Sequence, residues 1–367
     1  AYEMSEGLVG SEMCIRDRYP SEKDKTYGTF VKMFKESIEH NTNDIVFDCC
    51  FIRGRSNSFI VKVYKYIIFY FAIIYKTLFT KYDFIYNHQI THSAPALRFC
   101  RCFRKFKLVM NIHGGDIVTI DKTSEKLLSL AFPLLINSDL IVVPSEYFKN
   151  IVLNKIPGIS LNQLFVSASG GVDKNVFTCL NSHIMSIGTI VYVSRIDAGK
   201  GWDVLVDAIG ELKLSGEISG KRVLFVGYGG QTELLNKKIK EFNLSDCCCY
   251  LGPKTHQELN ELYNQSDVMI FPTMLYESLG LVGIEAMACG CPVIGSNIGC
   301  LPEYIKDGIT GFLFESGNSH ELAERITYFY KLTDEQRNTM RIQAVKTAHQ
   351  YDSDEISRML ISKMKEI

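Results

Sequence analysis

The sequence predicts an α/β protein with parallel sheets in two domains, and three observations support this fold class. From residue 19 onward, short runs rich in β-branched and aromatic residues alternate with segments of helical periodicity. This is the pattern of βα units in a parallel sheet. The chain has 367 residues, enough for two domains of about 100–200 residues each. Its 46% hydrophobic and 22% charged residues are typical of a globular protein.

Nine runs are expected to form strands. In chain order they are DIVFDC, FIYNH, KLVMNIH, LIVVPS, LFVSAS, TIVYVS, RVLFVG, VMIFPT and PVIGS. Several end at a polar residue or a glycine that begins a loop, and open parallel sheets bind their ligands at these carboxyl ends. The less patterned stretch TCLNSHIMSIG follows the fifth run, so we expect the domain boundary near residues 178–188. The expected domains are 19–183 and 184–351, followed by a C-terminal helix in 352–367.

The first eighteen residues differ from the rest of the chain. They show neither a strand or helix period nor an apolar core of signal-peptide length. The piece LVGSEMCIRDR resembles a translated transposon-type sequencing-library adapter. We therefore expect residues 1–18 to be a cloning or read artefact, with the native sequence starting near Tyr19 and its first strand missing.

Charge and cysteine usage exclude some classes of partner. The formal net charge is −1, so no overall basic field argues for nucleic acid. The twelve cysteines include adjacent ones, as in Cys247-Cys248-Cys249, and form no paired C-x2-C metal pattern. Adjacent cysteines are poor disulfide partners, so a reducing cytoplasm is the expected setting.

The most apolar stretch is SFIVKVYKYIIFYFAIIYKTLF. Its charge-free run between Lys65 and Lys76 has ten residues, too short to span a bilayer core of about 30 Å. One interpretation is a helix packed on the sheet with its lysines reaching outward. The other is an amphipathic helix at a membrane surface, which would give residues 59–80 a peripheral membrane contact.

A strand, a loop and a helix are expected in VMIFPTMLYESLGLVGIEAMACG. The loop turns into the helix at Gly280, so backbone N–H groups from Gly280 to Gly283 would be unpaired and suited to a nucleotide diphosphate. Glu277 precedes this point and Glu285 lies about one turn inside the helix. Carboxylates repel phosphate, so both suit sugar or ribose hydroxyls better. A solvated surface role is the competing interpretation for either glutamate alone.

Two cations follow the expected strand TIVYVS. Arg195 and Lys200 would lie in one loop at its carboxyl end, where they could neutralise a diphosphate leaving group; surface salt bridges are the alternative. The fragment AGKGW lacks the upstream glycine and the Ser or Thr of a Walker A loop. RVLFVGYGGQTELL fails as a dinucleotide fingerprint because Thr232 occupies the third glycine position.

Histidines follow two expected strands of the first domain. His113 precedes Gly114 and Asp116 in HGGD, and His88 ends FIYNH. A histidine followed by glycines that let backbone approach a ligand is a candidate polar site; a core or loop-stabilising histidine is the alternative. No histidine pair sits at i, i+4 on a convincing helix, so a metal site is not expected. Gly171, in VSASGGVDKNVF, could bring backbone to the same cleft or form a plain turn.

In combination, these motifs resemble the retaining GT-B glycosyltransferases of family 4, also called glycosyl transferases group 1. The resemblance covers nearly all of residues 19–367 and implies two Rossmann-like domains facing a cleft. It implies a nucleotide sugar on the second domain, the acceptor on the first, and a C-terminal helix that crosses back to the first. It rests on Arg195 with Lys200, Glu277 and Glu285 with seven residues between them, EAMACGCPVIGS, Glu303 in LPEYIKDGITGFLF, HGGD and GGVDKNVF.

The resemblance also implies roles for single residues. Arg195 and Lys200 would contact the diphosphate, Glu285 the ribose and Glu277 the donor sugar, with His113 near the reaction centre and Asp116 orienting it. The expected catalytic set is His113, Glu277, Arg195 and Lys200. The expected donor-binding set is Arg195, Lys200, Glu277, Ser278, Gly280, Leu281, Val282 and Glu285. The residues expected at the acceptor or in the cleft are His88, Gly114, Asp116 and Gly171. No cofactor or metal is expected.

The expected activity is transfer of a sugar, with retention, from a nucleoside diphosphate sugar to a glycan or lipid-linked acceptor in polysaccharide or cell-surface glycan biosynthesis. The expected location is the cytoplasm, at the inner face of the membrane. Two alternatives stay open: a GT-B nucleotide-sugar epimerase and a non-catalytic, membrane-associated glycan-assembly subunit. The chain departs from the family at its adapter-like start and at Cys300, where a second glycine is common.

Overall fold

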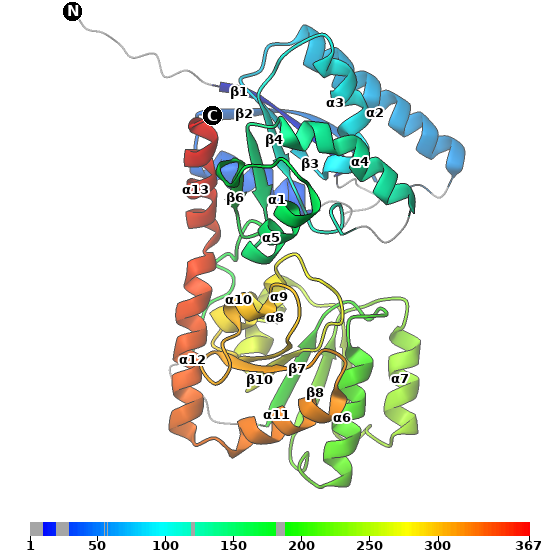
Figure 1. Ribbon diagram of the computed structural model, residues 1–367. Helices are drawn as coiled ribbons and strands as arrows, with labels where there is room; N and C mark the ends of the chain where they lie inside the picture. Colours follow the sequence, from blue (N-terminus) through cyan, green and yellow to red (C-terminus); the bar gives the residue numbers. More distant parts are fainter. Residues whose placement is uncertain (1–9, 20–28, 55, 57, 119–121, 181–187) are drawn as a thin grey trace, which may run out of the picture. The chain divides into compact units, whose positions relative to one another are not determined.

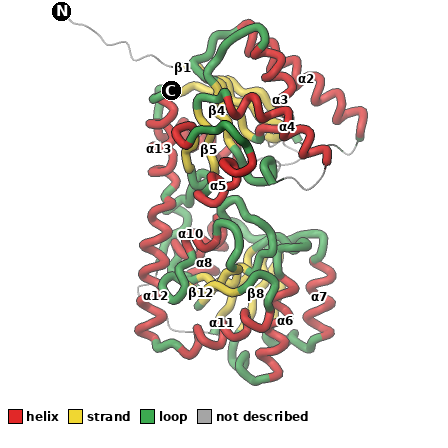
Figure 2. The backbone as a smooth tube through the Cα atoms, viewed as in Figure 1, coloured by secondary structure: helices red, strands yellow, loops and turns green. Residues whose placement is uncertain are grey.

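The computed structural model describes residues 10–19, 29–54, 56, 58–118, 122–180 and 188–367 (Figure 1). The chain divides into two compact units, one formed by residues 1–170 with 354–367 and the other by residues 171–353. Each unit contains a six-stranded parallel sheet with helices around it (Figure 2). The predicted α/β class with parallel sheets in two Rossmann-like domains is confirmed.

The first unit has the strand order β2-β1-β3-β4-β5-β6, and all its neighbouring strands are parallel. Its elements are β1 (Gly10–Tyr19), α1 (Thr29–Asn41), β2 (Ile45–Arg53), α2 (Phe59–Phe79), β3 (Ile85–His88), α3 (Ile90–Arg101), β4 (Leu108–Asn111), α4 (Lys122–Ile136), β5 (Leu140–Val143), α5 (Glu146–Lys155), a 3₁₀ turn (Leu161–Gln163), β6 (Leu164–Val166) and α13 (Ser353–Lys365).

Strand residues of this sheet alternate between two cores, because successive side chains of a strand point to opposite faces. Met110 and Ile141 face the core that α2, α3, α4 and α5 cover. Val109 and Leu140 face the core that α1 and α13 cover. The helix at the C-terminal end of the chain therefore completes the core of the first unit.

The adapter-like segment occupies a strand position in the first sheet, so the absence of the native first strand stays a prediction. The segment Gly10–Tyr19 forms β1, which pairs with β2 on one side and β3 on the other. Parallel pairing is made by backbone groups, so a segment without a clear side-chain period can occupy a sheet position, and sequence periodicity misses it. The adapter origin of residues 1–18 stays a prediction.

Helix α2 combines features of both interpretations of its sequence. Phe69, Ile73 and Thr77 are buried against the unit, as expected for a helix packed on the sheet. The prediction that the lysines reach outward is wrong for Lys65 and Lys76. Lys65 donates to the Gly54 carbonyl oxygen at 3.0 Å, and Lys76 pairs with Asp48. The outward face of α2 is apolar instead.

The second unit has the strand order β12-β11-β10-β7-β8-β9, again all parallel. Its elements are β7 (Thr189–Val193), α6 (Trp202–Leu214), β8 (Arg222–Val226), α7 (Thr232–Glu241), β9 (Cys248–Gly252), α8 (His256–Asn264), β10 (Val268–Phe271), α9 (Leu281–Ala288), β11 (Val293–Ser296), α10 (Leu301–Tyr304), β12 (Gly311–Phe314), α11 (Ser319–Lys331), α12 (Asp334–Ala348) and a 3₁₀ turn (His349–Tyr351).

The sheet order of the second unit positions its loops. β7 and β10 are neighbours although they are far apart in the chain. Because parallel strands end at the same edge of the sheet, the loops that follow β7 and β10 lie next to one another. The unit begins at Gly171, whereas the sequence placed the boundary near residues 178–188; part of that stretch, residues 181–187, lies outside the described residues.

Candidate functional site

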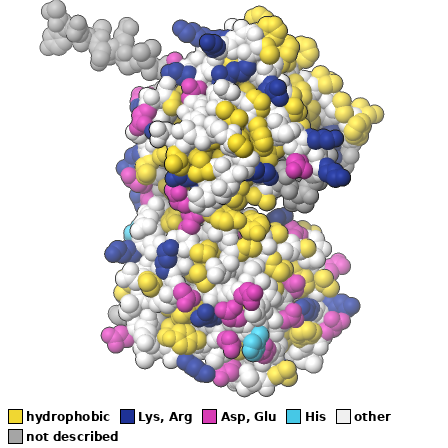
Figure 3. Space-filling model, viewed as in Figure 1, with side chains coloured by type: hydrophobic (Ala, Val, Ile, Leu, Met, Phe, Trp, Pro, Cys, Tyr) yellow, Lys and Arg dark blue, Asp and Glu magenta, His cyan; other side chains and the backbone are white. Residues whose placement is uncertain are grey.

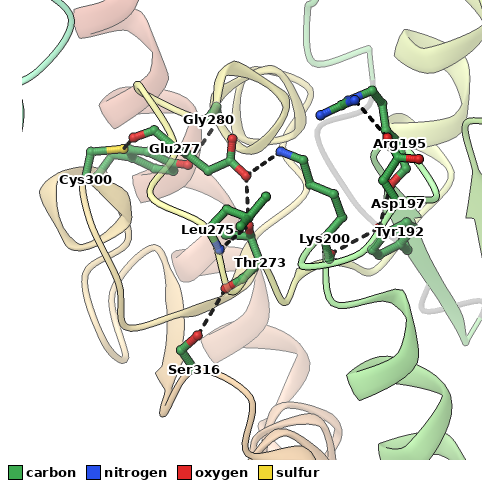
Figure 4. Close-up of polar contacts among 11 residues, drawn as sticks. Tyr192, Arg195, Asp197, Lys200, Thr273, Leu275, Glu277, Gly280, Cys300 and Ser316 are labelled. Carbon is green, nitrogen blue, oxygen red and sulfur yellow. Dashed lines mark hydrogen bonds and ion pairs between the residues drawn. The ribbon is translucent and has the colours of Figure 1, made fainter. Parts of the chain in front are cut away.

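The loops after β7 and β10 meet at an ion pair between Lys200 and Glu277. Lys200 Nζ lies 2.7 Å from Glu277 Oε1, and the two side chains are 13% and 16% exposed. The hydroxyl of the buried Thr273 donates to the same carboxylate oxygen at 2.8 Å (Figure 4). Since an ion pair at this depth is screened less than a surface pair, it fixes the position of both side chains.

Close backbone packing positions Lys200. Gly201, at the start of α6, has φ +73, and a Cβ there would lie 1.7 Å from the Pro272 carbonyl oxygen. Only glycine fits this approach of the β7 loop to the β10 loop. The Tyr192 hydroxyl donates to the carbonyl oxygen of Lys200 at 3.1 Å and to that of Arg195 at 3.3 Å. Both ends of the loop are therefore tied to β7.

Arg195 is the more accessible of the two predicted cations. Its side chain is 69% exposed, and its Nη1 lies 2.8 Å from Asp197 Oδ2. Asp197 also accepts a hydrogen bond from the Gly230 backbone N–H at 2.7 Å. Figure 4 shows the cationic ends of Arg195 and Lys200 directed toward the loop of Glu277. An exposed ion pair is weak, so Arg195 can exchange Asp197 for an anionic ligand at low cost.

The start of α9 is an accessible helix N-terminus beside this pair. Gly280 caps the helix with φ +76, and the Tyr304 hydroxyl donates to its carbonyl oxygen at 3.1 Å. Added Cβ atoms would lie 2.8 Å from the Phe271 ring at Gly280 and 2.7 Å from the Tyr304 hydroxyl oxygen at Gly283. The first N–H groups of a helix have no partner within it. Six predicted donor-binding residues here are partly exposed: Glu277, Ser278, Gly280, Leu281, Val282 and Glu285.

Glu285 has an unusual environment for a carboxyl group. Burial raises its pKa to about 7, although the residue keeps some contact with solvent. Within the described part of the chain, no hydrogen bond to its carboxylate is found, and no opposite charge offsets its burial. A buried carboxylate without donors costs free energy, and a ligand that brings hydroxyl groups would remove that cost.

A histidine cluster lies at the carboxyl ends of β3 and β4 in the first unit. His88 Nδ1 and His113 Nε2 are 3.1 Å apart, and the two rings stack with centroids at 5.3 Å. Asp116 accepts from the backbone N–H groups of His113 and Ile90, at 3.0 and 3.3 Å. His113 is partly exposed, whereas His88 is buried. His88 can therefore act on a ligand only through His113, and Asp116 orients the main chain of the loop.

Gly114 and Gly171 occupy different units. Gly114 is buried with φ +90, and its carbonyl oxygen accepts from the backbone N–H groups of Ile117 and Val118. Gly171 has φ +72 and begins the second unit, where the following residue, Val172, donates to the Tyr351 carbonyl oxygen at 2.7 Å. The structure therefore places Gly171 outside the unit to which the sequence assigned it.

The structure adds residues that sequence reasoning missed. Thr273 and Tyr304 hold Glu277 and the start of α9, and Cys300 donates from its Sγ to the Glu277 carbonyl oxygen at 3.2 Å. Thr273 ends the run VMIFPT, so its position after a strand was a usable signal. Tyr304 left no such signal, because its contact arises from the packing of α10. Across the residues that the structure places, no group of three His, Cys, Asp or Glu could hold a metal ion.

The second unit is similar to a family of known proteins. Residues 187–347, most of the second unit, match the family model described as glycosyl transferases group 1. A relative from Klebsiella pneumoniae, named an uncharacterized 41.2 kDa protein in the cps region, is 27% identical over 69% of this chain and 71% of its own. D-inositol 3-phosphate glycosyltransferase of Mycolicibacterium smegmatis is 29% identical over 47% of this chain and 38% of its own. The chain thus spans well under half of that second relative.

Solved structures resemble the chain over almost its whole length. Anabaena HepE in complex with UDP and glucose has a TM-score of 0.75 at 19% identity, covering 98% of this chain and 100% of its own. Sucrose-phosphate synthase of Thermosynechococcus elongatus has a TM-score of 0.77 at 18% identity, covering 97% and 98%. Identities this low show the fold alone. The chain therefore has the GT-B fold of two Rossmann-like domains, and its second unit matches the glycosyl transferases group 1 family.

Proposed function

We propose that this protein is a retaining, metal-independent glycosyltransferase of family 4. It would move a sugar from a nucleoside diphosphate sugar to a glycan or lipid-linked acceptor, in polysaccharide or cell-surface glycan biosynthesis at the cytoplasmic side of a membrane. The observation that carries the proposal is the Lys200–Glu277 pair next to the N-terminus of α9. This arrangement supplies a cation, a hydroxyl acceptor and free N–H groups in one place.

The positive end of this site suits a diphosphate. Free N–H groups at a helix start and the helix dipole attract phosphate, and α9 offers them at Leu281 and Val282. Lys200 and Arg195 would add two positive charges. In the transition state of sugar transfer, negative charge grows on the departing diphosphate, and preorganised donors stabilise it.

Lys200 and Glu277 would exchange partners when the donor binds. The diphosphate is a stronger partner for Lys200 than the single carboxylate it contacts in the structure. Glu277, still held by Thr273, would then accept hydrogen bonds from the hydroxyls of the donor sugar. Glu285 would accept those of the ribose, whose hydroxyls supply the donors that its buried carboxylate lacks.

The first unit would supply the acceptor side. His113 is the polar, partly exposed end of the histidine cluster, and we assign it to the donor sugar near the reaction centre.

UDP is the nucleotide to test first, since the structure of Anabaena HepE contains UDP and glucose and that of the pneumococcal O-GlcNAc transferase GtfA contains UDP and GlcNAc.

The decisive experiment replaces Lys200 and measures sugar transfer. Losing one charge-assisted hydrogen bond worth about 1.5–3 kcal/mol should slow turnover about 10- to 150-fold. We expect Lys200→Ala to lose UDP release from UDP-glucose and acceptor while its circular dichroism spectrum is unchanged. The matched control is Lys213→Ala, which removes an exposed pair with Asp246 in the same unit. Donor turnover equal to that of the unsubstituted protein would refute the assignment.

Two further measurements separate the alternatives. A nucleotide-sugar epimerase needs no acceptor, so an isomerised sugar after incubation with donor alone would favour it. A non-catalytic subunit would bind no nucleotide sugar in calorimetry. For the retaining mechanism, the anomeric coupling constant of the first product should match that of the donor, and an inverted value would contradict it.

A further inference from the structure

Helix α2 turns an apolar face toward solvent. Its large exposed side chains include Ile60, Tyr64, Ile67, Ile68, Phe71, Tyr75 and Phe79. Apart from the neighbours Ile67 and Ile68, they follow one another at intervals of three or four residues, which is the helical period, so they form one stripe. The stripe lies opposite the face that buries Phe69, Ile73 and Thr77. We call these seven residues the α2 outer face.

A second exposed apolar pair lies at the end of α3 and in the turn that follows it. The Arg104 guanidinium donates to the Thr77 carbonyl oxygen at 3.0 Å, which fixes this turn at the C-terminal end of α2. Phe99 and Phe103 are exposed there, with ring centroids 5.0 Å apart. Single exposed apolar residues are normal, but contiguous apolar patches usually mark an interaction site.

The chain around this patch is strongly basic. Between Phe59 and Lys107 there are nine Lys and Arg residues and one acidic residue, Asp83, whereas the whole chain has a net charge of −1. Figure 3 shows hydrophobic side chains gathered over α2 with Lys and Arg side chains beside them. The exposed basic residues are Lys62, Lys81, Arg98, Lys105 and Lys107.

We propose that the α2 outer face and the basic turn after α3 dock on an anionic lipid bilayer. Amphipathic helices bind at such surfaces by burying an apolar face among the headgroups, while Lys and Arg attract acidic lipids. Tyr64 and Tyr75 suit the interface because their rings are apolar and their hydroxyls polar. The docking is peripheral, since no helix among the described residues is long and apolar enough to cross a membrane.

Charge favours lipid over a second copy of this chain. Two copies joined through this surface would place basic residues against basic residues, and like charges at an interface oppose association. The inference extends the proposed function to a specific surface, but it uses no residue of the second unit. Vesicle binding measured without any nucleotide sugar therefore succeeds or fails independently of the transfer assay.

The first test is flotation of the full chain with vesicles. We expect binding to phosphatidylcholine vesicles that contain phosphatidylglycerol and little binding to pure phosphatidylcholine. Ile68→Ser/Phe71→Ser/Tyr75→Ser should weaken binding at least about ten-fold, because it removes apolar side chains that enter the interface. The matched control is Leu214→Ser/Ile342→Ser, which removes exposed apolar residues of the second unit. Equal loss in both variants would overturn the assignment of the surface.

Charge reversal tests the lipid headgroup. Lys105→Glu/Lys107→Glu should weaken binding to acidic vesicles at least about ten-fold, because each basic residue near an anionic surface contributes a several-fold factor in affinity. Added salt should also weaken binding of the unsubstituted protein to acidic vesicles, because salt screens the attraction between charges. Vesicle binding that neither salt nor charge reversal changes would overturn the role of acidic lipid.

A fluorescence test locates the inserted face. The native Trp202 is buried, so it provides a constant background. Phe71→Trp should be quenched by brominated lipid, whereas Leu214→Trp should not. Quenching of neither added tryptophan in vesicle-bound protein would show that another face binds. Sedimentation velocity tests whether a second copy occupies the surface instead. If the unsubstituted protein forms a dimer that the serine variant at 68, 71 and 75 does not form, and if it binds no vesicles, a second copy is the occupant and the proposal is overturned.

Discussion

Glu285 carries a carboxyl group that burial makes harder to ionise. Its pKa is raised to about 7, against 4.5 for an ordinary glutamate. The folded protein therefore holds the proton more tightly than the unfolded chain between these pH values. By linkage, the tighter binding of this proton stabilises the folded protein. This stabilisation is fully present below about pH 4.5 and is lost as pH rises through about 7.

The substitution Glu285→Gln should remove this pH dependence, because an amide does not ionise in the range. At about 1.4 kcal/mol per pKa unit, the variant should gain a few kcal/mol of unfolding free energy relative to the unsubstituted protein between pH 4.5 and 8. Urea unfolding at several pH values measures it. The control is Glu261→Gln, an exposed glutamate of α8. A stability difference that stays constant with pH would contradict the raised pKa.

Donor binding should show the opposite dependence on pH in the unsubstituted protein. If the ionised Glu285 accepts hydrogen bonds from ribose hydroxyls, the affinity for UDP-glucose should rise as pH increases through about 7. Calorimetry at pH 6 and pH 8 measures this change. The Glu285→Gln variant should bind more weakly at pH 8 and show little change between the two. Affinity of the unsubstituted protein that falls over this range would place the ribose elsewhere.

Among the elements, the turn from β7 into α6 depends on one glycine. Gly201 has φ +73, and a Cβ there would overlap the Pro272 carbonyl oxygen at 1.7 Å. Gly216 has a similar φ of +78 but nothing within 4 Å of an added Cβ. Gly216→Ala should therefore cost only the strain of the left-handed conformation, about 1–2 kcal/mol.

Gly201→Ala adds a steric clash to that strain, so it should destabilise the second unit by clearly more than Gly216→Ala. The clash would also separate the β7 loop from the β10 loop and displace Lys200 from Glu277. Urea unfolding followed by Trp202 fluorescence measures the stability, because Trp202 begins α6 in this unit. Equal destabilisation by the two alanine substitutions would show that the loop after β10 moves to accommodate the added Cβ at no cost in stability.

All nine predicted strands are found in the structure, and the three that were missed share a cause. β9 and β12 contain no β-branched residue, and β1 contains only one, Ile15. β9 is CCYLG, and β12 begins at Gly311, whose added Cβ would lie 1.8 Å from the Val293 carbonyl oxygen of β11. A short stretch of sequence contains no information about how closely the backbones of two strands pack. It indicates only those strands whose own residues favour a strand.

The site was predictable as a set of residue types but not as a set of contacts. Strand ends and spacing identified Lys200 and Glu277 separately. Their pairing at 2.7 Å follows from the adjacency of β7 and β10, which local sequence does not specify. The same limit applies to His88 and His113, whose stacking depends on β3 and β4 being neighbours. Likewise, only the packed structure shows which face of α2 is buried.

For the whole molecule, the two ends of the described chain belong to one unit. α13 returns to the first unit, and Leu360, Ile361 and Met364 share a core with Val31 and Phe34 of α1. The Ser357 hydroxyl also lies 2.7 Å from that of Ser37. The folding of the first unit therefore requires residues that are synthesised after the entire second unit.

This order of synthesis gives a prediction about stability. Leu360→Ala removes buried side-chain atoms from the first unit and should cost about 2–5 kcal/mol there. Met359→Ala, at an exposed position of the same helix, should cost little, since surface substitutions usually stay within about 0.5 kcal/mol. Circular dichroism, which reports on both units, should reveal the loss as an earlier unfolding step. Fluorescence of Trp202, the single tryptophan, should unfold as before because it reports on the second unit. An equal shift of the Trp202 transition would mean that the two units unfold together, and an unchanged circular dichroism transition would mean that α13 contributes nothing to the first core.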